Sequence, residues 1–426
     1  MKITCALENF DFSKINSDLD VELFVYNNDR SKGCIGAKIL KEVHDSKLIP
    51  HEKAWDLLSI ALSVIASDQA GHRQKSPDGW TREFDLTISV IDELFWNTQK
   101  KLLEKLLSFL TTDRWNLTFI EGGEYPELHP KAFYQLEDCV ALLSGGLDSF
   151  IGVTNLVKQN YKPYVVTQTV RGDGENQNSF AKKLGNLAQF KTNHNVKVPK
   201  PETPASQRSR SIIFLAYGVL IASSLEKHRQ NEEVTLYVCE NGYISINPPI
   251  TPGRVGSLST RTTHPVVLNI FQQILINCGL NITICNPYRF MTKGEMLTKC
   301  LDQDLIEEFA HLTTSCGRYG VYNNTHCGRC VPCLVRRASF FYWKGKEFDQ
   351  TEYKFNDLAI NDDNHANFDD VFSMRMAVLN RAEMGTSRWI GASLSSNLIE
   401  SKKLYQNTVE RGLLEMQEFL ADLGLV

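Results

Sequence analysis

A glycine-rich hexapeptide near the middle of the chain has the residue types that hold phosphate. It reads Ser144-Gly145-Gly146-Leu147-Asp148-Ser149 and lies between an apolar segment and a segment with helical spacing. Adjacent glycines allow backbone geometries closed to other residues, so that amide N–H groups can approach an anion. The two serines add hydroxyl donors, and the positive end of the following helix faces the same point. The sequence therefore predicts a phosphate-binding loop, of neither the lysine-bearing G-x-x-x-x-G-K type nor the dinucleotide G-x-G-x-x-G type.

A second feature with chemical potential is a cluster of cysteines. Four of the eleven cysteines have ten, two and two residues between them, namely Cys316, Cys327, Cys330 and Cys333. Four thiolates at this spacing can surround Zn²⁺ as a tetrahedron, and Gly328 would ease the turn between ligands. His326 is an alternative ligand, and an iron–sulfur cluster also accepts four thiolates. In a reducing compartment this clustering favours a bound metal over disulfides.

The elements that must position these residues follow a regular alternation of strands and helices. From about residue 136 strands alternate with helices, which indicates a parallel sheet covered on both faces. The predicted strands are 138–143, 164–169, 234–239 and 282–285, and the predicted helices are 149–158, 178–190 and 209–228. Residues 353–426 are predicted to be helical, with a terminal amphipathic helix from about Ser401.

The segment before this alternation is predicted to form a unit of its own. Its apolar spacing predicts strands at 21–26, 83–91 and 115–120 and helices at 51–68 and 92–110. We therefore expect three regions in the chain. These are an α+β N-terminal extension over 1–134, an α/β domain with the phosphate loop and the four-cysteine element over 135–350, and a helical C-terminal region over 351–426.

Composition and charge exclude several classes of protein. Hydrophobic residues make up 42% and charged residues 23% of the 426 residues, which is ordinary for a globular protein. The net charge of -4 gives no excess of positive charge for binding phosphate backbones, so nucleic acid is not expected as a direct partner. The longest apolar stretch, Ile212 to Ala222, is shorter than the roughly 20 residues of a membrane span. The first residues have no apolar core of a signal peptide, so we expect a cytoplasmic protein without membrane contact.

The two motifs together resemble a known family. The hexapeptide resembles the PP-loop of the N-type ATP pyrophosphatases, and with CGRCVPCLVRR at 327–337 it resembles QueC, the 7-cyano-7-deazaguanine synthases. Weaker matches lie between them in the right order: Arg210 before an apolar helix, then Pro287, then Thr292-Lys293-Gly294-Glu295. The resemblance covers about residues 136–345. The N-terminal extension, the helical tail and the segment 240–265 more closely resemble the QueC-like proteins of antiphage defence, QatC of the Qat system and its relative in type IV CBASS.

The resemblance implies a fold and a reaction. The fold is the PP-loop, adenine nucleotide alpha hydrolase-like parallel sheet. QueC enzymes use ATP to adenylate the carboxylate of 7-carboxy-7-deazaguanine, releasing pyrophosphate, and then transfer the acyl group to ammonia, releasing AMP; a second adenylation leads to the nitrile. By matching position, residues 144–149 would bind ATP, and Asp148 would face the ligand and hold Mg²⁺. Arg210 and Lys293 would neutralise charge developing on the phosphates, and the four cysteines would hold zinc as a strut.

The segment that would hold the substrate departs from the QueC pattern. Glu240 and Asn241 stand where QueC carries an aspartate-bearing G-Y-P-D type segment that helps to hold the deazaguanine. A long loop then brings together Arg254, Arg261 and His264. We expect these cations to bind the substrate carboxylate or a phosphate, and the alternative is that they belong to a solvated loop.

Three hypotheses follow for the function. The first is an ATP-dependent enzyme that delivers a 7-deazaguanine carboxylate to ammonia or to a protein amine, with other proteins of a defence operon as partners and a homodimer as a further alternative. The second is a tRNA-modifying PP-loop enzyme, against which the absence of a recognisable RNA-binding module counts. The third is a non-catalytic nucleotide-binding scaffold of a defence complex, although an intact phosphate loop argues against it.

Overall fold

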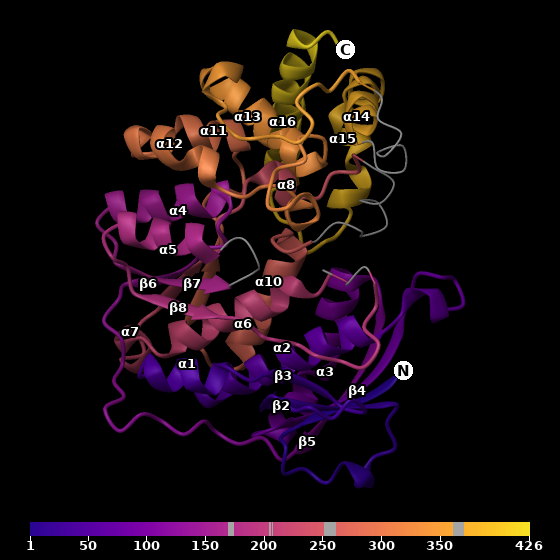
Figure 1. Cartoon of the computed structure of the whole chain (residues 1–426), viewed down its shortest axis with the longest axis vertical. Coiled ribbons are helices and arrows are strands. Elements are labelled where there is room, and N and C mark those ends of the chain that lie inside the picture. The colour runs from indigo at the N-terminus through magenta and orange to yellow at the C-terminus, as the bar shows by residue number, and fades with distance from the viewer. Residues whose placement is uncertain (169–173, 204–205, 207, 251–260, 361–369) are drawn as a thin grey trace.

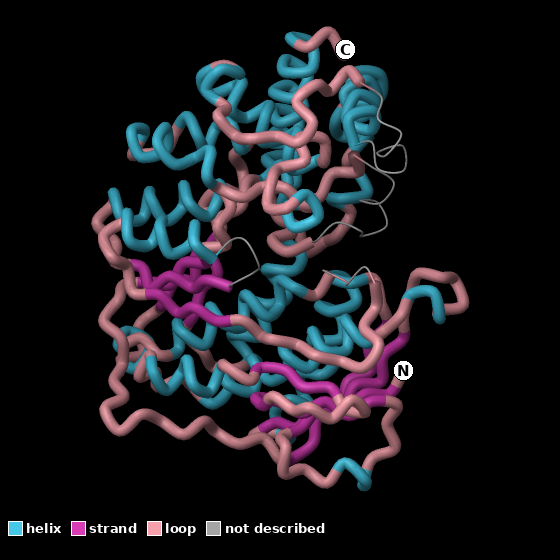
Figure 2. The backbone as a smooth tube through the Cα atoms, viewed as in Figure 1, coloured by secondary structure: helices cyan, strands magenta, loops and turns pink. Residues whose placement is uncertain are grey.

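Two five-stranded sheets, one in each half of the fold, organise the molecule. The computed structural model describes residues 1–168, 174–203, 206, 208–250, 261–360 and 370–426. The strand orders are β3-β2-β1-β4-β5 and β10-β9-β6-β7-β8, and every strand pair within them is parallel. Figures 1 and 2 show the first sheet at the bottom of the view, the second above it, and a group of helices at the top.

The N-terminal sheet is half-buried. Its strands are β1 Lys2–Ala6, β2 Leu19–Val25, β3 Gly33–Gly36, β4 Glu83–Val90 and β5 Arg114–Glu121. Alternate residues of β4 and β5, such as Phe84 and Trp115, are buried, whereas their neighbours Asp85 and Asn116 are exposed. Three helices accompany the sheet: α1 Ile39–Asp45, α2 Glu52–Ala70 and α3 Glu93–Thr111. Because the sheet is wholly parallel, the unit is α/β, and our expectation of an α+β unit was wrong.

The second sheet carries the phosphate loop. Its strands are β6 Cys139–Leu142, β7 Pro163–Gln168, β8 Gln189–Thr192, β9 Val234–Tyr237 and β10 Ile282–Cys285. Read from β8 to β10, the strands stand in the order 3-2-1-4-5 by their position in the chain. Successive strands are added on one side of β6 as far as β8 and on its other side from β9 onward, so the strand order reverses between β6 and β9. In open parallel sheets ligands bind outside the carboxyl ends of the strands at this point. The loop that follows β6 and the residues that follow β9 therefore lie where a ligand is expected.

Helices cover both faces of this sheet. They include α4 Leu147–Lys158, α5 Gly174–Lys183, α6 Arg210–Ser223 and α10 Pro265–Asn277; two short helices, α7 Glu226–Arg229 and α8 Gly242–Ser245, pack against α6 and against the C-terminal helices, respectively. Helices α4 and α5 pack on one face and α6 on the other. The predicted helix 178–190 was partly wrong, since it ends at Lys183 and is followed by β8, which sequence reasoning missed. The predicted helix 209–228 is divided into α6 and α7.

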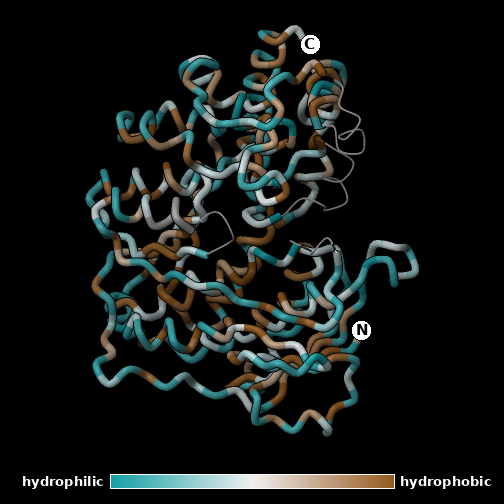
Figure 3. Tube along the Cα trace, viewed as in Figure 1, coloured by the Kyte–Doolittle hydropathy of each residue, from teal (hydrophilic) through white to brown (hydrophobic). Residues whose placement is uncertain are grey.

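The two units share one hydrophobic core. Helix α2 packs against α6, and α3 packs against α10. One cluster of buried apolar residues spans both units from Ile3 to Leu425, and a separate cluster includes Leu143 and Phe150. Figure 3 shows hydrophobic residues concentrated in the strands and in the helices between the sheets. Cys34 and Lys197 also join the units through a pair of backbone hydrogen bonds of 2.8 and 2.9 Å. The boundaries predicted at 134 and 350 stay predictions.

The remaining helices lie together beyond the carboxyl edge of the second sheet (Figure 1). They are α11 Lys293–Thr298, α12 Gln303–Phe309, α13 Val331–Lys344, α14 Asp370–Met384, α15 Thr386–Trp389 and α16 Lys402–Asp422. Helix α16 packs against α8, α11 and α13, so the C-terminal region closes over elements of the second unit. No helix in the described ranges combines the length and hydrophobicity that a bilayer span requires.

Candidate functional site

The hexapeptide forms the predicted strand–loop–helix turn between β6 and α4. Gly145 has a φ of +86°, a left-handed conformation that favours glycine, and Gly146 caps the first turn of α4. The hydroxyls of Ser144 and Ser149 lie 3.1 Å apart, and Ser149 Oγ also donates to the carbonyl of Gly146 at 2.9 Å. The turn is thus braced by its own serines at the amino end of a twelve-residue helix. This geometry suits a bound phosphate.

Asp148 is the most constrained side chain of the loop. It is 5% exposed, forms an ion pair with Lys293, and accepts hydrogen bonds from the backbone N (3.0 Å) and the side-chain Nδ2 (2.7 Å) of Asn241. Burial alone would raise the pKa of Asp148, but the charge of Lys293, a side-chain hydrogen bond with Glu240 and the hydrogen bonds from Lys293 and Asn241 hold it below its ordinary value. We expected Asp148 to face the ligand. It is buried and ties together the starts of α4, α8 and α11, and its role toward a ligand stays a prediction.

Capping interactions fix the two partners of Asp148. Asn241 caps α8, where its Oδ1 accepts from the backbone N of Ile244 at 3.0 Å. Lys293 begins α11 directly after Thr292, which forms a reciprocal capping pair with Glu295. The buried amide and ammonium groups are therefore held by local structure before any ligand arrives.

The C-terminal helix supports this arrangement from behind. Glu415 of α16 accepts a hydrogen bond from the hydroxyl of Thr292. Arg411, one turn earlier, donates to Glu295 at 2.6 Å and to the carbonyl of Phe290 at 2.7 Å. Sequence reasoning missed Glu415 and Arg411. The one available signal was an acidic residue at 415 between the buried Leu413 and Met416 of an amphipathic helix.

Arg210 lies at the same edge of the sheet as the loop. It is the first residue of α6, and its charge acts on His194, which follows β8. Burial, and then the charge of Arg210, lower the pKa of His194 to about 4. The ring of His194 is 2.9 Å from the amide of Gln168 at the end of β7. Arg210 is thus placed beyond the carboxyl ends of β7 and β8, next to the strand that carries the loop.

Glu240 is placed between β9 and Asn241. Its backbone is fixed by the side chain of Asn286, which donates to the Glu240 carbonyl at 2.9 Å. The Nδ2 of Asn241 lies 3.5 Å from a carboxylate oxygen of Glu240. The structure therefore brings Glu240 and Asn241 together with Asp148 and Lys293.

Two of the three predicted substrate cations lie in a different place. Arg261 and His264 line a cavity of about 120 Å³ whose lining residues include none of the loop 144–149. Arg261 donates to the carbonyl of Phe109 at 2.9 Å. His264 caps α10 by accepting from the backbone N of Val266 at 3.3 Å, and its Nε2 lies 3.3 Å from the carbonyl of Ser393. Arg254 lies outside the described residues.

The environment of His264 disfavours the charged form of its imidazole ring. Burial, followed by the charge of Arg261, lowers the pKa of His264 to about 4. A neutral imidazole with both nitrogens engaged in the fold offers no charge to a carboxylate or phosphate. His264 therefore acts as a helix cap in this structure, and its expected contribution to a substrate site stays a prediction.

The four predicted cysteines converge on one point. Their sulfurs lie within 4.8 Å of one another, with 3.9 Å between Cys316 and Cys330 and 3.9 Å between Cys327 and Cys333. A tetrahedral Zn²⁺ with bonds of about 2.3 Å requires sulfur–sulfur distances of about 3.8 Å. The geometry thus fits a single tetrahedral ion and not disulfides, and all eleven cysteines are free.

The backbone around the cluster is shaped for thiolates. The amides of Arg318, Cys327 and Cys330 each lie 3.3 Å from a cysteine sulfur, where they donate hydrogen bonds. Gly328 has a φ of +85°, and a Cβ there would lie 2.5 Å from the carbonyl of Phe355, so only glycine fits. The alternative ligand, His326, accepts from the backbone N of Ser315 at 3.1 Å through its Nε2. These contacts leave the four sulfurs as the donor set.

A short segment connects the cysteine cluster to the phosphate loop. Thr314, two residues before Cys316, donates from its backbone N to the carbonyl of Gly145 at 2.9 Å. The fully buried Arg336 of α13 fixes this segment by donating to the carbonyls of Thr313 (3.1 Å) and Ala310 (2.6 Å). The cluster therefore lies where a bound ion would stiffen one wall of the loop, as the predicted strut requires.

Comparison with known proteins adds no further assignment. No family model matches the chain, and no curated protein matches it. The interpretation of the site thus depends on its own geometry and on the motifs of the sequence.

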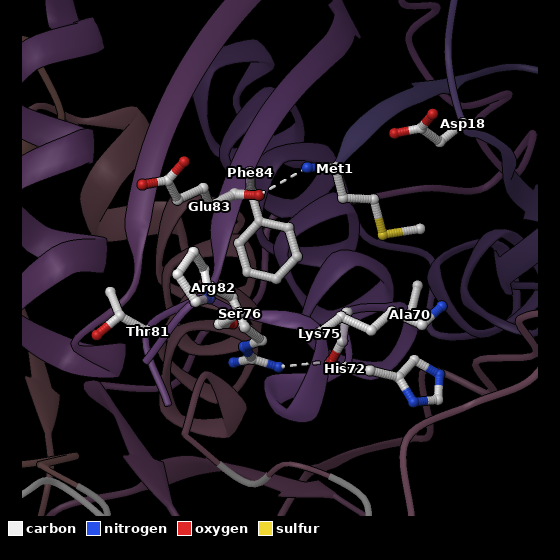
Figure 4. Close-up of a pocket in the computed structure, with 12 residues that line it drawn as sticks. Met1, Asp18, Ala70, His72, Lys75, Ser76, Thr81, Arg82, Glu83 and Phe84 are labelled. Atoms are coloured by element: carbon white, nitrogen blue, oxygen red, sulfur yellow. Dashed lines mark hydrogen bonds between the residues drawn. The ribbon is translucent and has the colours of Figure 1, made fainter. Parts of the chain in front are cut away.

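A larger pocket, of about 510 Å³, lies away from this site on the N-terminal unit. Figure 4 shows Arg82 among its lining residues, which also include His72, Lys75 and Glu83. The guanidinium of Arg82 is 3% exposed and is engaged by Asp68, Asp113 and the carbonyl of Gly71. These donors hold the N-terminal unit together, and the pocket contains none of the residues of the two sequence motifs.

Proposed function

We propose that this chain is a QueC-like, ATP-dependent enzyme that adenylates a 7-deazaguanine carboxylate and transfers the acyl group to an amine. The observation that carries the proposal is the SGGLDS turn after β6, at the point where the strand order reverses. The buried Lys293 and the helix-leading Arg210 lie at the same edge of the sheet. A turn of this kind has backbone and hydroxyl donors for phosphates and two cations for the charge that develops on them.

The proposed reaction has two steps, and both balance. A carboxylate oxygen of the substrate attacks the α-phosphorus of ATP, and the bond from that phosphorus to the bridging oxygen breaks, releasing pyrophosphate. The amine nitrogen then attacks the acyl carbon, the bond to the AMP oxygen breaks, and the amine proton passes to solvent. In this scheme residues 144–149 bind the leaving pyrophosphate, and Lys293 and Arg210 stabilise its negative charge.

The fold supports a positioning role for Asp148 better than a role as an open metal ligand. Its carboxylate is engaged by Lys293 and Asn241, so it directs the ammonium of Lys293 and fixes the start of α8. Mg²⁺ bound with ATP would neutralise phosphate charge. The carboxylate of Asp148 is already engaged in the fold and is therefore not an open ligand for this ion. In this proposal Glu240, which lies beside Asn241 and is hydrogen-bonded to Asp148, would accept hydrogen bonds from the N–H edge of a guanine-type base.

The proposed zinc site contributes structure and not chemistry. Four thiolates close a tetrahedral site, which leaves no open position for a substrate. The amine acceptor in this proposal is ammonia or an amine of a partner protein. The reaction would take place in the cytoplasm and serve antiphage defence.

One experiment tests the proposal against its two competitors. Purified protein is incubated with ATP and with 7-carboxy-7-deazaguanine, with tRNA, or with neither, and AMP and pyrophosphate are quantified. We expect AMP only when the deazaguanine is present, and mass spectrometry should then show an amide once an amine is supplied. AMP that depends on tRNA instead would support the tRNA-modifying enzyme. ATP binding without AMP under any of these conditions would support the scaffold and overturn the proposal.

A further inference from the structure

A pocket of about 440 Å³ lies at the carboxyl edge of the N-terminal sheet, far along the chain from the phosphate loop. It is formed by residues that follow β1, including Glu8, and by the last residues of β2, including Phe24. This sheet also has the order 3-2-1-4-5, so the chain reverses direction between β1 and β4. The pocket lies at this carboxyl edge beside that point, over the ends of β1 and β2 and not of β4, and its size is typical of small-molecule sites.

The segment after β5 completes the pocket by crossing the end of the sheet. Gly123 donates from its backbone N to the carbonyl of Val90 at 3.1 Å, and a Cβ at this glycine would lie 2.4 Å from the Val90 backbone. Only glycine permits this crossing. The next residues are then held over the pocket, because Trp55 donates to the carbonyl of Glu124 at 3.0 Å and the hydroxyl of Tyr125 donates to Pro50.

The inner surface of the pocket is apolar and aromatic. Phe24 has a φ of +61° at a bulge in β2, and its ring stacks on Trp55 with centroids 4.7 Å apart. Leu40 and Tyr125, which also line the pocket, are each 39% exposed. A ligand with an apolar body would cover this surface.

The charge on the rim of the pocket is of one sign. Glu8, Glu124 and Glu127 line it, and its lining residues include no Lys, Arg or His. None of these carboxylates has a cationic side chain within ion-pair distance among the residues that the structure describes. No helix of eight or more residues begins directly after β1, whereas α4 begins directly after β6 in the second sheet; the long helix α3 starts at this edge after β4, whose residues do not line the pocket. A nucleotide would be repelled here.

We propose that this pocket binds a small organic cation, namely a primary amine on an aromatic or aliphatic body. The carboxylates of Glu8, Glu124 and Glu127 would face the ammonium group, and Leu40, Tyr125 and the ring of Phe24 would contact the apolar body. The proposal does not depend on the adenylation activity.

The test uses calorimetric titration of the full chain with three amines and their alcohol counterparts. The pairs are tryptamine and tryptophol, phenethylamine and phenethyl alcohol, and hexylamine and hexanol. The first variant replaces Glu8, Glu124 and Glu127 by Gln, and its matched control replaces the exposed Glu232, Glu308 and Glu400 by Gln. Leu40→Trp, which fills the pocket, is the second variant. All of these positions are exposed, and circular dichroism verifies that each variant is folded.

We expect at least one amine to bind about fivefold more tightly than its alcohol, which is the upper range for ion pairs at an exposed rim. The triple pocket variant should remove this difference, the control triple variant should retain it, and Leu40→Trp should abolish binding of both compounds. The proposal is overturned if none of the amines binds at millimolar concentration. It is equally overturned if the amine binds the triple pocket variant as tightly as the unmodified protein.

Discussion

Replacing Glu415 by Gln should make the protein more stable at neutral pH, and increasingly so as the pH rises. Glu415 is 6% exposed and has Glu295 as a neighbour of like charge. Burial first, opposed by the hydrogen bond from Thr292 and reinforced by Glu295, raises the pKa of Glu415 from about 4.5 to about 8. The folded protein therefore carries a neutral carboxyl group here at pH 7, whereas the unfolded chain carries a carboxylate.

The sign of the effect follows from proton linkage. Between about pH 4.5 and pH 8 the folded state binds one more proton at Glu415 than the unfolded state does, so the stability from this group falls as the pH rises. Each pH unit within this window costs about 1.4 kcal/mol, which amounts to roughly 3 kcal/mol between about pH 5 and pH 7.5. Glutamine keeps a donor and an acceptor for Thr292 but does not titrate. The Glu415→Gln variant therefore does not lose this free energy of unfolding as the pH rises.

The assay is urea unfolding of the unmodified protein and of Glu415→Gln at several pH values in this window. The difference in the free energy of unfolding between the two proteins should grow with pH by about 1.4 kcal/mol per unit. Glu418→Gln, which changes an exposed carboxylate on the same helix, is the control and should produce no such trend. A Glu415→Gln difference that stays constant to within about 0.5 kcal/mol over the window would show that Glu415 is ionised in the fold and would refute the reasoning.

Two further predictions concern the phosphate loop and the metal. Lys293→Met leaves Asp148 buried without its cation, so we expect a loss of about 3–5 kcal/mol of stability, whereas the double variant Asp148→Asn/Lys293→Met should recover most of it. AMP formation should stay at least about 100-fold reduced in the single and in the double variant. The control Lys299→Met, at an exposed position, should leave AMP formation unchanged. Recovery of activity in the double variant would contradict the proposed role of Lys293. Metal analysis should find about one zinc per chain. The Cys330→Ser variant should lose the zinc and melt at a lower temperature, whereas the control Cys285→Ser, outside the cluster, should retain the zinc. Iron, or no metal, in the unmodified protein would overturn the zinc site.

The phosphate loop and the cysteine cluster were predictable because their geometry is local. Two adjacent glycines between an apolar strand and a helix can form few turns, and Cys327, Cys330 and Cys333 are close in the chain. The turn found at 144–149 and the converging sulfurs are confirmed as structures. The binding of ATP and of zinc stays a prediction.

The N-terminal sheet shows why alternation alone misleads. Apolar and polar residues alternate in β4 and β5, a pattern that usually accompanies antiparallel sheets with one solvated face. Here the sheet is parallel and still has one polar face, with Asp85 and Asn116 exposed and hydrogen-bonded to each other at 2.8 Å. The direction of strand pairing is set by distant segments, including the short strand β3 that the sequence pattern did not indicate.

The surroundings of the site residues could not be predicted for the same reason. Asp148 forms its ion pair with Lys293, which is 145 residues away in the chain. Arg261 and His264 do lie together, as their spacing suggested, but their surroundings come from Phe109 of α3 and from Ser393. No local pattern contains the information that places these segments against one another.

The two flanking regions are parts of the site and not appendages to it. Asp68 of α2 accepts hydrogen bonds from the backbone N (3.2 Å) and the hydroxyl of Ser209, directly before Arg210. At the other side, Glu415 of α16 holds Thr292, directly before Lys293. Arg210 and Lys293, the two cations proposed to stabilise the leaving pyrophosphate, thus each begin a helix. The residue directly before each of them is hydrogen-bonded to a side chain outside residues 136–345, the region that resembles QueC. Because a displacement of about 1 Å at a catalytic group can cost on the order of 100-fold in rate, residues 136–345 alone would retain the motifs but lose the contacts that position these two cations.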